Sequence, residues 1–109
     1  MILFIDTTDL KSITYATIGD AVTQKQYQID PHSSHQLLEY LEKFFKQTKF
    51  DRKKLKKIVV CSGPGSYTGT RIGVTHALAL GFAWNIPVKP IPKEKVPINL
   101  IDLNKIKKI

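Results

Sequence analysis

Apolar and polar residues follow two different periods along this chain. The short apolar runs at residues 2–6 and 58–61 are typical of strands that are buried on both faces of a sheet. Residues 12–18 alternate instead, and the Gly19-Asp20 turn after them predicts a β-hairpin with residues 22–29 as its second arm. Asp30-Pro31 ends the second arm, because proline disfavours helical backbone in the residue before it.

Two longer stretches have helical character. The first begins at a Ser33 or Ser34 cap, ends near Gln47 and has one apolar face, made of Leu37, Leu38, Leu41, Phe44 and Phe45. The second is an apolar stretch from Thr70 to Trp84, and a strand at about residues 87–91 follows it. The order β-β-β-α-β-α-β predicts an α/β fold with a mixed five-stranded sheet, the pattern of a single actin-like (ribonuclease-H-like, ASKHA) lobe. We expect residues 1–91 to form this lobe and residues 92–109, which contain lysine and proline without a clear period, to form a divergent tail.

A glycine-rich segment, residues 62–74, joins the predicted buried strand to the second helix. Turns of this kind hold phosphate sites and partner-facing loops in α/β proteins. The segment is not a P-loop, because no lysine follows Gly69, and Thr68 stands where G-x-G-x-x-G needs its third glycine. Its backbone N–H groups could form an anion nest. The alternative is a tight turn that lets helix and strand pack closely, with Gly69 needed for the fold if its φ is positive.

This segment resembles the signature of the TsaB family, the bacterial subunit required with TsaD to make threonylcarbamoyladenosine at position 37 of tRNA. The signature residues are Gly63-Pro64-Gly65-Ser66-Tyr67-Thr68-Gly69-Thr70-Arg71-Ile72-Gly73. Three weaker matches occur in the family's order, and they are residues 1–8, His32-Ser33 with Leu37-Leu38, and residues 85–88. The resemblance runs from residue 1 to about residue 91, whereas family members usually continue into a second lobe.

The resemblance implies a non-catalytic scaffold subunit, without cofactor or metal, that binds a TsaD-like partner. The residues expected to bind through the signature loop are Gly63, Pro64, Gly65, Ser66, Tyr67, Thr68, Gly69 and Arg71. On the second helix Gly73, Ala77 and Gly81 are four residues apart, and Thr70 extends the row. Small residues allow another backbone to come close, so this row is the predicted partner interface and a surface for self-pairing of the isolated protein. The alternative is close packing within the chain.

Asp6 suggests an alternative function, that of a nucleotide-binding enzyme. A nucleotide-dependent ATPase or phosphotransferase lobe would use Asp6 and the glycine-rich loop to hold magnesium and phosphate. The glycine that such proteins have near this aspartate is missing from Asp6-Thr7-Thr8. A carboxylate at a strand end also commonly accepts hydrogen bonds from loop N–H groups.

Other chemistry is not indicated. Ser66 or Thr68 would need a base to act as a nucleophile, and His76 lies too far along the helix to reach back. His32 and His35 have no third ligand in an established zinc motif, so we predict no metal site.

The net charge of +8 adds a third hypothesis, a basic RNA-binding module. Lysines concentrate at residues 49–57 and 105–108, which is the electrostatic pattern of a nucleic-acid partner, although a solvated surface is the alternative. Weak or indirect contact with tRNA is therefore expected. The single cysteine excludes an intrachain disulfide. No apolar stretch is long enough for a membrane span and no secretory signal is expected, which predicts a cytoplasmic protein without a membrane partner.

Overall fold

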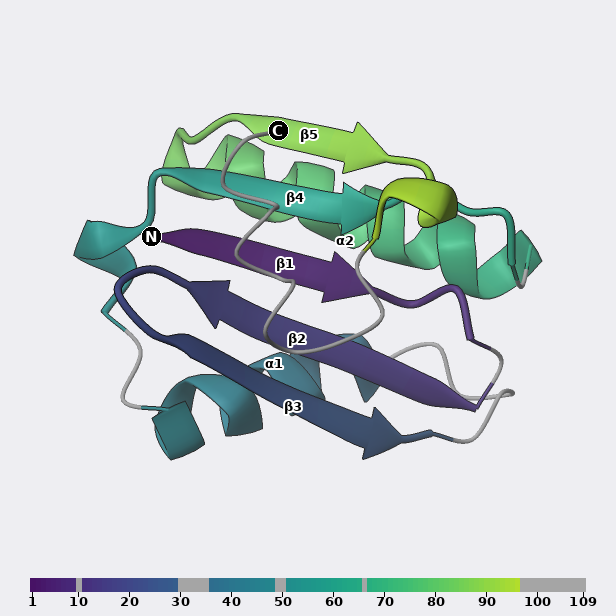
Figure 1. Cartoon of the computed structure of the whole chain (residues 1–109), viewed down its shortest axis with the longest axis horizontal. Coiled ribbons are helices and arrows are strands. Elements are labelled where there is room, and N and C mark those ends of the chain that lie inside the picture. The colour runs from purple at the N-terminus through teal and green to yellow at the C-terminus, as the bar shows by residue number, and fades with distance from the viewer. Residues whose placement is uncertain (10, 30–35, 49–50, 66, 97–109) are drawn as a thin grey trace.

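Five strands form one mixed sheet with the order β3-β2-β1-β4-β5 (Figure 1). The strands are β1 (Ile2–Asp6), β2 (Ser12–Ile18), β3 (Val22–Gln28), β4 (Lys57–Cys61) and β5 (Val88–Ile91). β2 is antiparallel to both β1 and β3, whereas β4 is parallel to both β1 and β5. The predicted hairpin, mixed sheet and parallel crossovers are therefore confirmed.

The computed structural model describes residues 1–9, 11–29, 36–48, 51–65 and 67–96. Several predictions fall outside this part of the chain. They concern the helix cap at Ser33 or Ser34, the histidines His32 and His35, the loop residue Ser66 and the second lysine group at residues 105–108.

The two central strands are apolar throughout because both of their faces are buried. In β1, Leu3 and Ile5 belong to the core on one face, and Phe4 belongs to the core on the other. β4 alternates in the same way, with Val60 on the first face and Cys61 on the second. This pattern explains the continuous apolar runs in the sequence.

Two helices cover one face of the sheet, α1 (Gln36–Thr48) behind β2 and β3, and α2 (Tyr67–Trp84) behind β4 and β5 (Figure 1). The buried Tyr15 of β2 fixes α1 in place: its hydroxyl donates to the Leu37 carbonyl at 2.8 Å and its ring stacks on Phe44. Burial raises the pKa of the Tyr15 hydroxyl, which keeps this donor protonated.

The second helix begins earlier than the sequence predicts. It includes Tyr67, Thr68 and Gly69 as well as the expected stretch from Thr70. Its carboxyl end agrees with the prediction: Asn85 has a left-handed φ of 56°, which is common just past a helix end.

The opposite face of the sheet holds a second apolar core that includes Phe4, Ile18 and Val59. Among the described residues neither α1 nor α2 reaches this face, and Val96 packs against it after the short turn η2 (Lys93–Lys95). The boundary after residue 91 stays a prediction, but residues 93–96 contact the lobe directly.

Candidate functional site

The glycine-rich loop crosses the carboxyl edge of β1, β4 and β5. Gly63 has a φ of 99°, a conformation that favours glycine, whereas Gly69 lies inside α2. The condition under which Gly69 would be needed for the turn, a positive φ, is therefore not met. A Cβ atom at Gly65 would lie 2.6 Å from both the Cβ and the carbonyl oxygen of Thr8. Gly63 and Gly65 thus let the loop turn sharply and lie against the end of β1.

The end of β1 holds a chain of polar contacts beneath this loop. The Asp6 carboxylate accepts from the Thr8 backbone N–H at 2.9 Å and from the Thr8 hydroxyl at 2.7 Å. The Lys93 ammonium donates to the same hydroxyl at 2.7 Å. Next to Thr8, the Thr7 hydroxyl donates to the Gly69 carbonyl at 2.6 Å and joins β1 to the first turn of α2. Asp6 therefore acts in the way expected of a carboxylate that fixes a loop.

Lys93 is the member of this group that the sequence did not reveal. It lies in η2, in a stretch without hydrophobic periodicity, and no motif marks it. Its backbone N–H donates to the Gly63 carbonyl at 2.8 Å, and the Ser62 backbone N–H and hydroxyl both donate to the Ile91 carbonyl. The loop is thus held by the segment that follows β5.

Most polar groups described at this edge are bonded within the chain. The Thr70 hydroxyl oxygen is the one buried side-chain oxygen without a hydrogen-bond partner among the described residues. This arrangement favours the interpretation of the loop as a tight packing turn. Of the remaining loop residues, Tyr67 and Thr68 lie in the first turn of α2, and Pro64 and Arg71 are exposed.

The potential nucleophile and base near the sheet are in unreactive settings. Cys61 is buried, and burial raises the pKa of its thiol, which keeps it protonated at neutral pH. His76 Nε2 lies 3.4 Å from the Tyr15 hydroxyl, between the helices and the sheet, and burial lowers the pKa of its imidazole. Within the described ranges, no group of three His, Cys, Asp or Glu residues could hold a metal ion.

The row of small residues on α2 faces the chain's own sheet. Ala77 is 0% exposed, and a Cβ atom at Gly73 would overlap the side chain of Thr7. A Cβ atom at Gly81 would overlap the side chain of Val88 on β5. The predicted partner interface is not accessible here, because the sheet already occupies the space that the missing side chains provide. The alternative, close packing within the chain, accounts for these residues.

Large apolar side chains are exposed at other positions of the two helices, within the described residues. On α2, Leu78 is 52% exposed and Phe82 is 91% exposed, and as residues four apart they lie on the same side of the helix. On α1, Leu38 is 57% exposed. Single exposed apolar residues are common on proteins, but two large ones on one helical face indicate a contact surface.

The family described as "TsaD: tRNA N6-adenosine threonylcarbamoyltransferase" matches residues 25–103 of the chain. The chain belongs to this family. A curated relative, the tRNA threonylcarbamoyladenosine biosynthesis protein TsaB of Bacillus subtilis (strain 168), is 57% identical over 37 residues, or 34% of this chain and 16% of the relative. The resemblance to TsaB seen in the sequence is thus confirmed.

Two solved structures have the same fold as this chain. YeaZ from Pseudomonas aeruginosa superposes with a TM-score of 0.73 at 23% identity, over 84% of this chain and 44% of that structure. A second structure, of an uncharacterised protein similar to the peptidase YEAZ from Pseudomonas aeruginosa, gives 0.74 at 22% identity, over 84% and 42%. They confirm the predicted actin-like fold, and the chain spans less than half the length of either.

In the part of the chain that the structure describes, no helix is both long and apolar enough to cross a membrane.

Proposed function

We propose that this chain is a non-catalytic partner of a TsaD-type subunit in the formation of threonylcarbamoyladenosine in tRNA, in the cytoplasm. The observation that carries the proposal is the exposed apolar side of α2, with Leu78 and Phe82; Leu38 on α1 is exposed as well. The family description and the name of the Bacillus relative supply the reaction.

The exposed side chains support a helical partner. Burying a phenylalanine or leucine side chain contributes roughly 1.5–3 kcal/mol, so Phe82 and Leu78 together could stabilise a complex substantially. Aromatic residues are also enriched among those that dominate interface energies. In the absence of the partner, the same face would pair with a second copy of the chain.

The edge beneath the glycine-rich loop supports a non-catalytic role. Asp6 Oδ1 accepts two hydrogen bonds from Thr8, which is the arrangement of a carboxylate that fixes a loop. The Cys61 thiol lies beside the loop, close to Gly63 and Thr8, but it is buried and protonated, and the His76 imidazole lies on the other face of the sheet, where it cannot act as its base. The role of the chain would be to hold the partner in its active arrangement.

One observation favours the second candidate, a magnesium–nucleotide site: Lys93 places a cation beside Asp6 and Thr8, below the amino end of α2. Calorimetric titration with Mg-ATP separates the two functions. We expect no saturable binding, and micromolar binding that Asp6→Ala abolishes would replace the scaffold proposal with the nucleotide site.

Partner binding is tested by co-expressing the chain with a TsaD-type subunit and measuring the affinity of the pair by calorimetry. Phe82→Glu places a charge on the proposed interface and should weaken binding at least tenfold, about 1.4 kcal/mol, without loss of helical circular dichroism. Gln24→Glu on the exposed strand β3 adds the same charge elsewhere and should leave binding unchanged. Normal binding by a folded Phe82→Glu variant would contradict the proposed interface. Native mass spectrometry shows whether self-pairing decreases in parallel.

A further inference from the structure

The amino edge of the sheet, opposite the glycine-rich loop, carries a basic turn that is firmly attached to β1. This turn is η1 (Arg52–Lys54), and its Asp51 side chain accepts from the Lys53 N–H at 3.0 Å. The Met1 ammonium donates to the Lys54 carbonyl at 3.1 Å, and the Lys56 N–H donates to the Met1 carbonyl at 2.9 Å. The backbone that carries the basic side chains is therefore held against the sheet.

In the described part of the chain, basic residues outnumber carboxylates on this edge, where the acidic residues are Asp20 and Asp51. Arg52, Lys53, Lys54 and Lys56 are exposed, and Lys57 is partly exposed. Among the described residues, no carboxylate pairs with any of the four lysine side chains, while the Arg52 guanidinium lies 5.8 Å from the centre of the Trp84 ring. A cluster of unpaired cations creates a positive potential that attracts polyanions.

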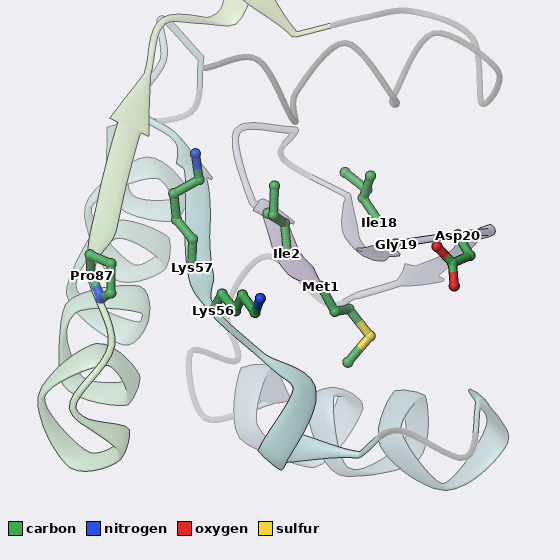
Figure 2. A pocket seen from close by; sticks show the side chains of 8 residues that line it. All are labelled: Met1, Ile2, Ile18, Gly19, Asp20, Lys56, Lys57 and Pro87. Carbon is green, nitrogen blue, oxygen red and sulfur yellow. The ribbon is translucent and has the colours of Figure 1, made fainter.

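A pocket of about 480 Å³ opens beside this turn (Figure 2). Its walls combine apolar side chains, two lysines and one carboxylate, and the residues are Met1, Ile2, Ile18, Gly19, Asp20, Lys56, Lys57 and Pro87. A pocket with apolar walls and adjacent cations suits a ligand that has a flat apolar part and a negative charge. The Asp20 carboxylate can accept a hydrogen bond from a base amino group or a ribose hydroxyl.

We propose that this edge binds single-stranded RNA, with the lysines of residues 53–57 against the phosphates and an unpaired base in the pocket. The inference rests on the proposed function, since tRNA is the substrate of that reaction. The pocket favours RNA over an acidic protein surface, because proteins recognise RNA largely through unpaired bases that they place against side chains while cations hold the backbone.

The phosphate contacts are tested with a charge-matched pair of variants. Lys53→Glu/Lys54→Glu reverses two charges on the basic turn, and Lys11→Glu/Lys25→Glu reverses two exposed charges elsewhere, on the β1–β2 connection and on β3. Binding of an unmodified tRNA transcript to the full chain is measured at several salt concentrations. The first variant should weaken binding about tenfold or more and lower the salt slope by about 2, and the second should stay within about twofold of the parent.

The base contact is tested by filling the pocket. A Cβ atom at Gly19 would lie 3.8 Å from Met1 Cγ, an ordinary contact, and Gly19 does not have a positive φ. Gly19→Leu should therefore fold and occupy the pocket, and Gly19→Ala is the control. The leucine variant should weaken binding of a single-stranded oligonucleotide about tenfold and leave duplex RNA binding unchanged.

Four results would overturn the proposal: no RNA binding by the parent at low salt, equal losses in the two charge variants, equal losses in Gly19→Leu and Gly19→Ala, or unchanged RNA affinity in Lys53→Glu/Lys54→Glu. If this last variant instead lost its affinity for the TsaD-type subunit, the turn would dock an acidic protein surface. The two proposals can also fail separately. If the parent chain does not bind a TsaD-type subunit but Lys53→Glu/Lys54→Glu still loses RNA binding selectively, the RNA site is supported and the proposed function is contradicted.

Discussion

The two faces of α2 differ in what they contact. The inward face is made of Gly73, Ala77 and Gly81, whose small size lets the sheet come close, and the outward face presents Leu78 and Phe82 to solvent. A helix that is apolar on all sides is expected to be buried on all sides. Among the described residues, only one side of α2 is buried. The other side carries large apolar residues of the kind found in buried surfaces, and no described residue covers them.

Enlarging the inward face should have the largest effect. In Gly73→Leu the new side chain overlaps Thr7, which cannot easily move because its hydroxyl is bonded to the Gly69 carbonyl. We expect a loss of about 3 kcal/mol or more in the free energy of unfolding, or no folded protein. The loss of stability is measured by denaturant unfolding, followed by circular dichroism. Ala79→Leu on the exposed side is the control, and equal losses in the two variants would show that the faces do not differ.

Ala77→Leu should have an intermediate effect. From the sequence, this substitution would keep the fold and weaken partner binding, but Ala77 is fully buried against the sheet. Overpacking typically costs about 1–3 kcal/mol, so we expect a lower denaturation midpoint. If the variant keeps its stability and loses affinity for a TsaD-type subunit, the inward face is accessible to a partner after all.

The smallest effect concerns His76, which lies beside the inward face and next to Tyr15. Burial lowers the pKa of His76 in the folded protein below its ordinary value, so the unfolded chain takes up the proton first as the pH falls. This contribution to stability is complete above the unfolded pKa, near 6.5, and decreases as the pH falls from there toward the lowered pKa. Denaturation midpoints at pH 7.5 and 5.5 should differ less in His76→Gln than in the parent. An identical difference in both would mean that other groups set the pH dependence.

The strands and α1 could be predicted because the order of apolar and polar residues in the sequence indicates each of them. β1 and β4 are continuous apolar runs, and α1 has one apolar face with Leu41 and Phe44 buried. The beginning of α2 could not be predicted, because glycine is a poor helix former and the bond from Thr7 to Gly69 that helps to fix this turn comes from a distant strand. The contact is tertiary and leaves no local signal in the sequence.

The site was predicted less well for two physical reasons. From Ala77 to Trp84, α2 is apolar around its circumference, so its sequence does not show which side meets the sheet, and Gly73 and Ala77 suited either environment. Lys93 follows the last strand in a segment without periodicity, and its position beside Thr8 depends on the path of the chain after β5. The glycine-rich loop was located correctly because glycine and proline mark turns directly.

The hydrogen bond from the Lys93 N–H to the Gly63 carbonyl has a practical consequence for protein engineering. A version cut after residue 91 would keep all five strands and both long helices, yet it would release the loop from Lys93 and uncover the core that Val96 contacts. The smallest fragment worth expressing therefore ends no earlier than Val96. Fusion partners and protease sites are best attached beyond that residue, where they leave the contacts of Lys93 and Val96 in place.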